Sequence, residues 1–421
     1  MASASKKTRL HGWHTAHGAN MADFGGYEMP LWYSSAKNEH LAVLTRAGTF
    51  DTSHMATVLV SGSEALDLLQ LCFTNDLAAC IGKDKKPLFP GRCVYGAFLN
   101  EQGQVIDDAI IFQIAEADYM VVVNAGMGAA IAGHLAAHKG GADIQITDLT
   151  DNLGKMDIQG PAAAKVMQKI LASPEAVFDK MPYFSFKGHF NESGPGADAV
   201  RLTDGAPILL SRTGYTGEFG FELFTAPEHF VNLWETVLTA GEEFNLIACG
   251  LAARDSLRAG AVLPLSHQDI GPWPFVRHPW PFALPYSDDK TGFTKSFVGD
   301  QALLAAEDAD YTLPFAGYDL RKVSLPAAVL DPDGKEIGTV LTCATDMAVG
   351  RCGEPIYSIT SPDTPEDCKI KGLCCGFVKV APPLSAGQEV TLKDARRRIK
   401  VRIQEDIRPN RTARIALKKM V

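Results

Sequence analysis

The residues best suited to chemistry lie in a glycine-rich stretch near the middle of the chain. Ser211–Glu222 reads SRTGYTGEFGFE, and its three glycines within seven residues let the backbone approach a flat ligand closely. Tyr215 offers an aromatic face, and Glu222 offers a carboxylate that can accept two parallel N–H bonds from an amidine-like ring edge. The stretch has no lysine and its carboxylates would repel a phosphate, so it does not indicate a phosphate-binding loop. A strand–loop–strand with ordinary turn glycines is the alternative.

Two pairs of like charges are further candidates. Asp107 and Asp108 begin an apolar strand, and because neighbouring strand side chains face opposite ways, one carboxylate can face a pocket while the other faces solvent. Arg254 and Arg258 lie four residues apart, so a helix that starts after Gly250 would place both guanidinium groups on one face. Each pair also has a simpler interpretation, namely an acid pair that ends a turn and a solvated arginine face.

Residues 271–285 form an unusual segment that is rich in proline and aromatic residues. Five prolines in 15 residues exclude a regular helix or a central strand. The aromatic rings are costly to leave together in water, which favours a pocket wall, although a packed surface cover is the alternative. The candidate substrate-pocket residues are Trp273, Trp280 and Phe282.

The composition limits the classes of function. Lys plus Arg number 40 and Asp plus Glu 49 among 421 residues, a net charge of −9, which argues against nucleic-acid binding and, weakly, against a membrane surface. No run of 18 apolar residues occurs, so we expect no membrane span, and the first ten residues do not resemble a secretory signal. These features predict a cytoplasmic protein without nucleic-acid or membrane partners.

The cysteines point the same way. Nine of them are scattered along the chain, which favours free thiols in a reducing cytosol over a disulfide framework. No two have CxxC spacing, and the adjacent Cys374 and Cys375 have no histidine-rich neighbour, so we expect no metal site.

The order of predicted elements indicates an α+β fold with antiparallel sheets. Asp23–Pro30, with two adjacent glycines and a proline, is predicted to be an ordered loop, and Leu41–Phe50 to include a short helix that Gly48 ends. The clearest strands and helices of the first half are predicted at Val94–Leu99, Val105–Phe112, Tyr119–Asn124 and Leu153–Ile158, and at Glu64–Leu71 and Gly126–His138.

The pattern of predicted elements changes from about Tyr311. Short strands alternate with turns there, which predicts a small β-barrel. We therefore expect a domain boundary near residue 310, with two interleaved α+β subdomains in 1–310 and the barrel in 311–421. The predicted barrel strands are Gly317–Leu320, Ala328–Leu330, Gly338–Thr342, Leu373–Val380, Glu389–Leu392 and Ile399–Ile403.

An ordered set of short motifs across the whole chain resembles the folate-binding T-protein family, which comprises the aminomethyltransferase of the glycine cleavage system and its relatives. The resemblance implies a multidomain fold, with two α/β sandwich-like domains around a central folate site and a small C-terminal β-barrel. The matching motifs are Gly18–Met21, Asp23–Pro30, Phe50–Met55, Asn75-Asp76, Val105–Asp108, Val122–Ala125, Ile158–Pro161, Ser211–Glu222, Cys249–Arg258, Phe297–Gly299 and Gly338–Val340.

The resemblance also implies roles for individual residues. Asp108 and Arg254 match catalytic positions, with Asp108 beside folate N10 and Arg254 near the reacting group. The acceptor of the one-carbon unit would be tetrahydrofolate, and the donor's carrier would be a lipoyl-carrying H-protein. The positions that match folate contacts are Tyr95, Asp108, Asn124, Tyr215, Glu222 and Arg254.

The sequence departs from the family where the donor would lie. The family's L-E-A-G is Ala259–Val262 here, its P-x-E-x-G-L is Pro279–Leu284, and residues 351–372 look inserted. Both changed motifs lack the glutamate. These changes and the aromatic loop favour a folate-dependent demethylase as the alternative to the aminomethyltransferase, because aromatic rings suit methylated cations. A non-enzymatic folate-binding protein is the third hypothesis, but its K-G-C-Y-x-G-Q-E motif is absent and Asp108 is present.

Overall fold

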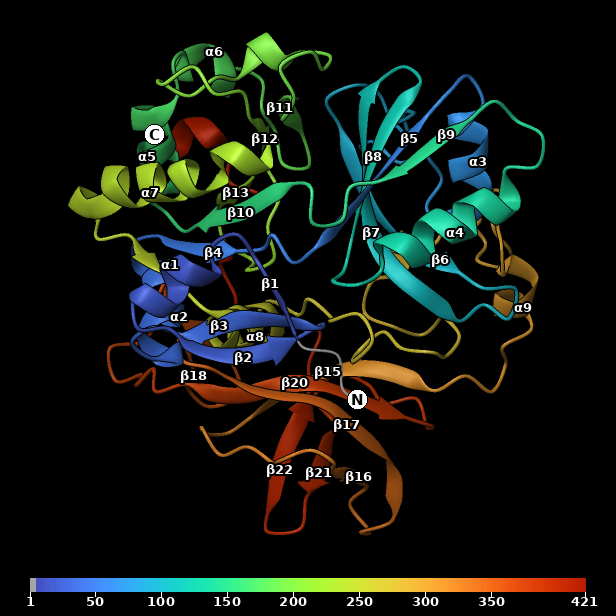
Figure 1. Ribbon diagram of the computed structural model, residues 1–421. Coiled ribbons are helices and arrows are strands. Elements are labelled where there is room, and N and C mark those ends of the chain that lie inside the picture. Colours follow the sequence, from blue (N-terminus) through green and yellow to red (C-terminus); the bar gives the residue numbers. More distant parts are fainter. Residues whose placement is uncertain (1–4) are drawn as a thin grey trace.

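The computed structural model describes residues 5–421, which form two sheet domains above a closed barrel (Figure 1). The second domain is inserted into the first. The chain lays down one strand of the first sheet, leaves it to build the whole second sheet, and then returns. The first sheet has the order β11 (Phe186–Gly188), β12 (Leu209–Ser211), β13 (Gly220–Thr225), β10 (Gly154–Gln159), β4 (Gly48–Asp51) and β14 (Ile247–Ala248).

The inserted second sheet presents the acid pair. Along β7 burial alternates, so that Asp107 is buried while Asp108 on the opposite side is half-buried. Ala97 of β6 lies opposite Asp108 in the antiparallel register, and Asn124 directly follows β8. The sheet order is β6 (Cys93–Leu99), β7 (Val105–Ala115), β8 (Asp118–Val123), β5 (Ala56–Ser61) and β9 (Gln145–Asp148).

The helices that cover the sheets have the expected apolar periodicity. In α3 (Ala65–Cys72) the buried residues are 65, 68, 69 and 72, which form a single helical face. In α7 (Phe230–Gly241) the same spacing buries Phe230, Leu233, Trp234 and Val237. Helix α5 (Ala163–Ile170) packs against α7, and α4 (Gly128–His138) packs against α3. Each domain therefore has its own core, in agreement with two sandwich-like units.

The barrel begins at Tyr311, next to the expected boundary at residue 310. Its closed order is β15 (Tyr311–Gly317), β20 (Leu373–Val380), β17 (Glu336–Asp346), β16 (Ala328–Leu330), β21 (Glu389–Lys393) and β22 (Arg398–Ile403). The predicted α+β fold class with a small C-terminal barrel is thus confirmed. The chain leaves the barrel after β22, and its last residues return to the first domain, where Leu417 packs into the core that contains Trp234.

Four local predictions are wrong in whole or in part. Asp23–Pro30 is a hairpin of β2 (Asn20–Phe24) and β3 (Tyr27–Trp32), because Gly25 and Gly26 form a tight turn at positive φ. Leu41–Phe50 combines the end of helix α2 (Ala36–Thr45) with strand β4, which is too short to show a periodicity. Residues 318–320 are not a strand. The barrel strand there is β15, which the sequence hid because Pro314 interrupts it.

The fourth correction concerns the cysteines. Cys352 and Cys368 form a disulfide within the apparent insertion 351–372, while the other seven cysteines are free thiols among the described residues. The two cysteines are 16 residues apart and come together because the segment folds back beside the hairpin of β18 (Val349–Arg351) and β19 (Ile356–Ser358). Nothing in their spacing separates them from the free thiols. None of the helices within residues 5–421 has the length and apolar character that crossing a bilayer requires.

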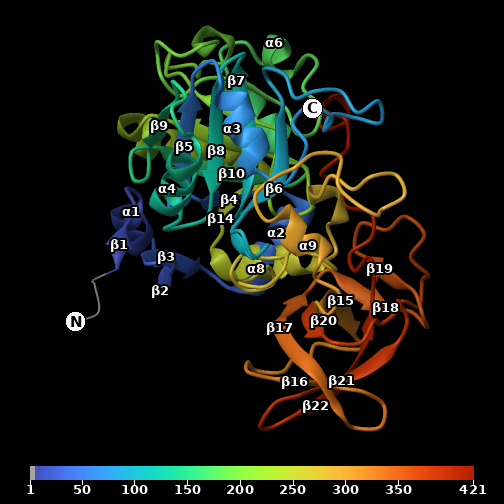
Figure 2. The same cartoon turned by 90° about the vertical axis from the view of Figure 1, so that its right-hand side faces the viewer.

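Helix α8 (Leu251–Gly260) lies at the junction of the barrel and the first domain (Figure 2). Arg408, on the segment that leaves the barrel, is fully buried beside it. Its Nη1 lies 2.5 Å from Asp346 Oδ2, and its Nε donates to Glu218 Oε1 at 3.1 Å. His40 Nε2 lies 2.9 Å from the other oxygen of Asp346. Burial by itself would raise the pKa of Asp346, but Arg408 and His40 hold it well below its usual range.

Removing the Arg408 charge should destabilise the whole molecule. Arg408→Met leaves two buried carboxylates without their cation, and breaking such a pair costs about 3–5 kcal/mol of unfolding free energy. Urea denaturation of this variant should therefore show a large loss. Arg201→Met is the matched control, because the carboxylates that pair with Arg201 are exposed to water. Equal losses in the two variants would contradict the proposed importance of the buried pair.

Candidate active site

A cavity of about 2270 Å³ lies between the two sheet domains and the barrel. It is larger than the roughly 300–1,000 Å³ that is typical of small-ligand pockets. The barrel contributes Cys343, Ala344 and Thr345 to its wall. The sequence-selected residues that line the cavity are Tyr95, Asp108, Asn124, Tyr215, Glu222, Arg254, Trp280 and Phe282. Residues from six separate parts of the sequence therefore come together in one space.

Trp273 is the candidate that lies elsewhere. Its ring packs against Gly271, where even one added carbon would meet the indole, and it lies 4.6 Å from Lys379 Nζ of β20. This ring belongs to the contact between the proline-rich segment and the barrel. Of the three aromatic residues predicted as a substrate pocket, two face the cavity and one supports the segment from behind.

Asp108 is held at the cavity wall by two hydrogen-bond donors. The hydroxyl of Tyr95 donates to Oδ2 at 2.8 Å, and Nδ2 of Asn124 donates to Oδ1 at 2.7 Å. These bonds fix both oxygens of the carboxylate. Strand β7 places Asp108 on the cavity side and Asp107 on the other. Asn124, which directly follows β8, donates a hydrogen bond to each of them.

Asp107 organises the floor beneath this carboxylate. It is fully buried and accepts hydrogen bonds from the backbone N–H and the side-chain amide of Asn124, both at 2.8 Å. Ser266 Oγ donates to it at 2.8 Å, and His267 Nε2 lies 3.2 Å away. The contacts join the second domain to the segment that follows α8. Ser266 and His267 also line the cavity, and the sequence analysis did not identify them.

The surroundings of Asp108 raise its pKa toward neutral pH. Burial, followed by the charge of Asp107, raises the pKa of Asp108 to about 6, while the bonds from Tyr95 and Asn124 partly oppose this rise. A carboxyl group with such a pKa can exchange a proton near neutral pH. Asp108 is thus suited to acid–base chemistry, which an ordinary exposed aspartate is not.

A chain of buried charges lies behind another part of the cavity wall, to which it contributes Glu222 and Arg254. Glu222 of β13 lies directly across from Asp157 of β10, and two like charges in that position would repel. Lys155 resolves the conflict, because its Nζ lies 2.6 Å from Glu222 Oε1 and 3.1 Å from Asp157 Oδ1. Arg254 Nη1 completes the chain at 2.5 Å from Asp157 Oδ2. Thr213 Oγ1 donates to the second oxygen of Glu222.

This chain keeps Asp157 ionised. Burial by itself would raise the pKa of Asp157, but Lys155 and then Arg254 lower it to about 2. Sequence reasoning missed Lys155 and Asp157. Their signal was present, since they lie two residues apart in a strand where polar residues alternate with apolar ones, and so share one face of the sheet.

Tyr215 and Arg254 lie beside one another in the cavity. The guanidinium carbon of Arg254 is 5.2 Å from the centroid of the Tyr215 ring, a cation–π contact. The Tyr215 hydroxyl donates to the carbonyl of Pro264 at 2.6 Å, which fixes the ring plane. Arg258, one helical turn after Arg254, is buried against Asp269 and Thr342 and so connects α8 to the barrel.

The aromatic loop lies against the Asp108 side of the cavity. Trp280 meets Tyr95 edge to face with ring centroids 4.6 Å apart, and its Nε1 donates to the carbonyl of Val262 at 3.1 Å. The ring of Phe282 is 5.7 Å from that of Trp280 and is 59% exposed. The exposed ring of Phe282 and the half-buried ring of Trp280 together form an apolar wall that adjoins the hydrogen-bonded carboxylate.

Gly260 stands where the family motif has a glutamate, and its surroundings leave no room for a side chain. A Cβ built on Gly260 would lie 1.8 Å from Asp346 Oδ2. The barrel's aspartate therefore fills the space beside α8 that a longer side chain at Gly260 would need. The two features depend on each other, because only glycine leaves room for the Asp346–Arg408 pair.

Comparisons with known proteins agree with one another. The GCVT N-terminal domain matches residues 10–273. An aminomethyltransferase from Geobacillus thermodenitrificans is 40% identical over 321 residues, 76% of this chain and 80% of that protein. One from Streptomyces coelicolor is 40% identical over 265 residues, 63% of this chain and 65% of the relative. The solved glycine cleavage system aminomethyltransferase T from Bartonella henselae superposes with a TM-score of 0.73 at 26% identity, covering 96% of this chain and 97% of that structure.

The hydrogen bond from Tyr95 should measurably tune Asp108. Tyr95→Phe removes a donor to the ionised carboxylate, and hydrogen bonds to charged groups are worth about 1.5–3 kcal/mol, so the pKa of Asp108 should rise by about one unit or more. Carbon NMR titration of isotope-labelled aspartate carboxyls would measure it. In Tyr318→Phe, where the lost hydroxyl donates to Glu389 on the barrel, the Asp108 titration should not move. An unchanged or lowered pKa in Tyr95→Phe would refute the assignment.

Proposed function

The chain belongs to the family of the GCVT N-terminal domain, and we infer that it acts as an aminomethyltransferase of the glycine cleavage system, transferring a one-carbon unit to a folate. The observation that carries this inference is the pairing of two walls across one cavity. One wall holds Asp108, whose pKa is raised to about 6, and the other holds Glu222 and Arg254 in a buried chain of charges. A flat ligand with several N–H donors and a reacting centre fits between them.

The acceptor is tetrahydrofolate, and Glu222 receives the donor edge of its pterin ring. Both Glu222 oxygens are already oriented, one by Lys155 and the other by Thr213. A carboxylate held in this way accepts parallel N–H bonds without first losing side-chain freedom. Tyr215 lies against the ligand with its ring plane fixed through Pro264. Tyr95 and Asn124 contact the ligand near Asp108.

Asp108 acts on the reacting end of the ligand. When bound, tetrahydrofolate supplies the two nitrogens, N5 and N10, between which the transferred carbon ends as a methylene bridge. The ionised Asp108 stabilises positive charge that develops on the migrating carbon as ammonia leaves, and it can accept the N10 proton because its pKa lies near neutrality. Arg254 lies near the same centre and is positioned by Asp157. Much of the remaining acceleration comes from holding the acceptor nitrogen close to the carbon.

The donor is an aminomethyl group on the lipoyl arm of an H-protein. The cavity volume of about 2270 Å³ leaves room for such an arm beside the folate. Demethylation of a small methylated donor has one feature in its favour, the apolar wall of Trp280 and Phe282. Asp346 leaves no room for a longer side chain at Gly260, but it is fully buried and paired with Arg408 and His40, so it does not replace a glutamate at the cavity.

Neutralising Asp108 should separate binding from turnover. Asp108→Asn keeps the shape but loses the charge, so it should fold and bind tetrahydrofolate while turnover drops on the order of 100-fold. Ammonia release and methylene-tetrahydrofolate formation, with an aminomethyl-loaded H-protein as donor, measure this. Native turnover should fall as pH falls through about 6, where the carboxylate gains a proton, and the variant should lack this limb.

Asp331→Asn, in a barrel turn, is the control for this experiment and should behave like the native protein. Native turnover by Asp108→Asn would remove the carboxylate from the mechanism. If the native protein releases no ammonia from the loaded carrier but demethylates a small methylated amine, the donor assignment is wrong and the demethylase hypothesis replaces it.

Neutralising Glu222 tests the pterin contact. Glu222→Gln retains an acceptor oxygen but loses the charge-assisted bonds, so tetrahydrofolate affinity should fall by about 1.5–3 kcal/mol, or roughly 10- to 100-fold. Lys155 keeps Asp157 as an anionic partner, so the fold should survive. Isothermal titration of tetrahydrofolate into the variant and into Glu192→Gln, a change on an exposed loop, gives the comparison. Wild-type affinity in Glu222→Gln would place the pterin edge elsewhere.

A further inference from the structure

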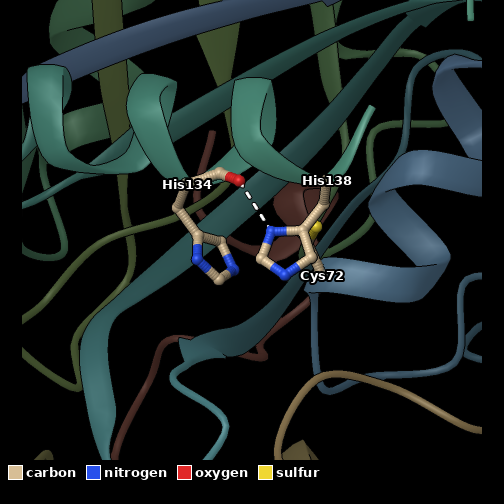
Figure 3. Close-up of side chains that lie close together, drawn as sticks. All are labelled: Cys72, His134 and His138. Carbon is tan, nitrogen blue, oxygen red and sulfur yellow. Dashed lines mark hydrogen bonds between the residues drawn. The ribbon is translucent and has the colours of Figure 1, made fainter. Parts of the chain in front are cut away.

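A cluster of three potential metal ligands lies in the second domain, outside the wall of the large cavity (Figure 3). Cys72 is the last residue of α3, and His134 and His138 are one helical turn apart on α4. One ligand atom from each residue lies within 4.8 Å of those from the other two. Cys72 is buried, and the two histidines are half-buried, so a small ion can reach the cluster from solvent.

The hydrogen bonds of the two histidines leave nitrogen lone pairs for a ligand. His138 Nδ1 lies 2.8 Å from the carbonyl oxygen of His134, so this nitrogen donates and Nε2 carries the lone pair. Such a bond from the second ring nitrogen to a carbonyl is the usual way in which proteins orient a metal-binding histidine. His134 Nε2 is buried and has no hydrogen-bond partner among residues 5–421. Buried nitrogens normally have a partner, so this one calls for an explanation.

We propose that Cys72, His134 and His138 bind one divalent cation of the zinc type, with water as the fourth ligand. A thiolate and two neutral imidazoles match the preference of Zn²⁺ for sulfur and nitrogen in a tetrahedral arrangement. Metal–ligand bonds of about 2.0–2.3 Å place neighbouring ligand atoms roughly 3.3–3.8 Å apart, so the three side chains need to close by only about 1 Å. Side-chain rotation in the half-buried histidines suffices for that.

The chemistry of binding is a proton-for-metal exchange at Cys72. The S–H bond breaks, the sulfur–metal bond forms, and the proton passes to the solvent. Burial raises the pKa of the Cys72 thiol to about 12, so without the cation the residue stays protonated near neutral pH. Burial and then the neighbouring His138 lower the pKa of His134 to about 4, so this ring does not have to lose a proton near neutral pH to bind.

The bound cation would fasten two helices that are far apart in the sequence. The end of α3 is also where Lys295 docks, since its Nζ donates to the carbonyls of Gln70 and Phe73 at 2.6 Å each. A cation at Cys72 therefore stabilises the point at which the segment after the proline-rich loop meets the second domain. The site is structural, and it does not depend on the reaction proposed for the cavity.

Cobalt provides a direct spectroscopic test. The full-length, tag-free protein is stripped with a chelator, freed of it and titrated with Co²⁺. We expect one equivalent to produce the intense visible bands of tetrahedral Co²⁺ together with a near-ultraviolet thiolate-to-cobalt band, and Zn²⁺ to abolish both. Zn²⁺ should also raise the melting temperature of the stripped protein.

Variants assign the ligands. Cys72→Ser should lose the thiolate band. His138→Gln should weaken Co²⁺ binding at least tenfold, and the fold tolerates this change better than one at Cys72 because His138 is only half-buried. Cys80→Ser is the matched control, because Cys80 is also a largely buried thiol of the same domain, with a pKa raised to about 11, and should retain both signals. Absence of the thiolate band in the native protein, or its persistence in Cys72→Ser, would overturn the proposal. Tetrahydrofolate binding, measured separately, reports on the cavity and not on this cluster.

Discussion

The pairing of buried charges around Arg408 is the constraint on which the cavity depends. A buried guanidinium is tolerated only when carboxylates and carbonyls surround it, and here they come from three separate parts of the chain. Asp346 ends strand β17 of the barrel, Glu218 precedes strand β13 of the first sheet, and the carbonyl of Leu257 belongs to α8. Because one side chain satisfies all three, the barrel, the first domain and α8 have a single relative position.

Helix α8 transmits that position to the cavity. Arg258 clamps the helix to the barrel through Asp269 and Thr342, while Arg254, one turn earlier, points to Asp157 and the cavity. The two arginines, alike in sequence, therefore divide into a structural cation and a site cation. On the far wall, Ser266 and His267 reach Asp107, so the segment after α8 also sets the position of the acid pair.

Two aspartates, half-buried Asp108 in the cavity wall and fully buried Asp157 behind it, have pKa values shifted in opposite directions. Asp157 lies between two cations, which lower its pKa to about 2, whereas Asp108 lies in a low-dielectric wall beside a second carboxylate, which raises its pKa to about 6. Residues of one chemical type thus serve different purposes, and the separation of their pKa values indicates which one exchanges protons. Asp157 remains a fixed charge that orients Arg254 and Lys155.

The sequence predicted those features that depend on local periodicity. The opposite orientation of the acid pair on β7, the amphipathic α3 and most barrel strands show their pattern within a few residues, and the ordered motifs indicated the family. The expected exposure of one member of the acid pair to solvent is wrong, because Asp107 is fully buried. Features that depend on distant partners were missed: β4 is four residues long, the strand at Tyr311–Gly317 contains Pro314, and Cys352 pairs with Cys368 only because its segment folds back. The cluster of Cys72 with His134 was hidden for the same reason, since its ligands come from two helices.

Local departures from a family pattern therefore need a spatial test before they are taken as a change of function. The glutamate missing beside α8 suggested a different donor, yet the barrel places Asp346 against Gly260, where a longer side chain would not fit. Asp346 is fully buried and paired with Arg408 and His40, so packing accounts for the glycine at position 260 and no charge is supplied to the cavity. The aromatic loop differs from this case, because Trp280 contacts Tyr95 and so adjoins the residue that holds Asp108. Packing does not account for the departure of this loop from the family pattern as it does for Gly260. Selectivity for the donor is therefore most directly sought at its rings.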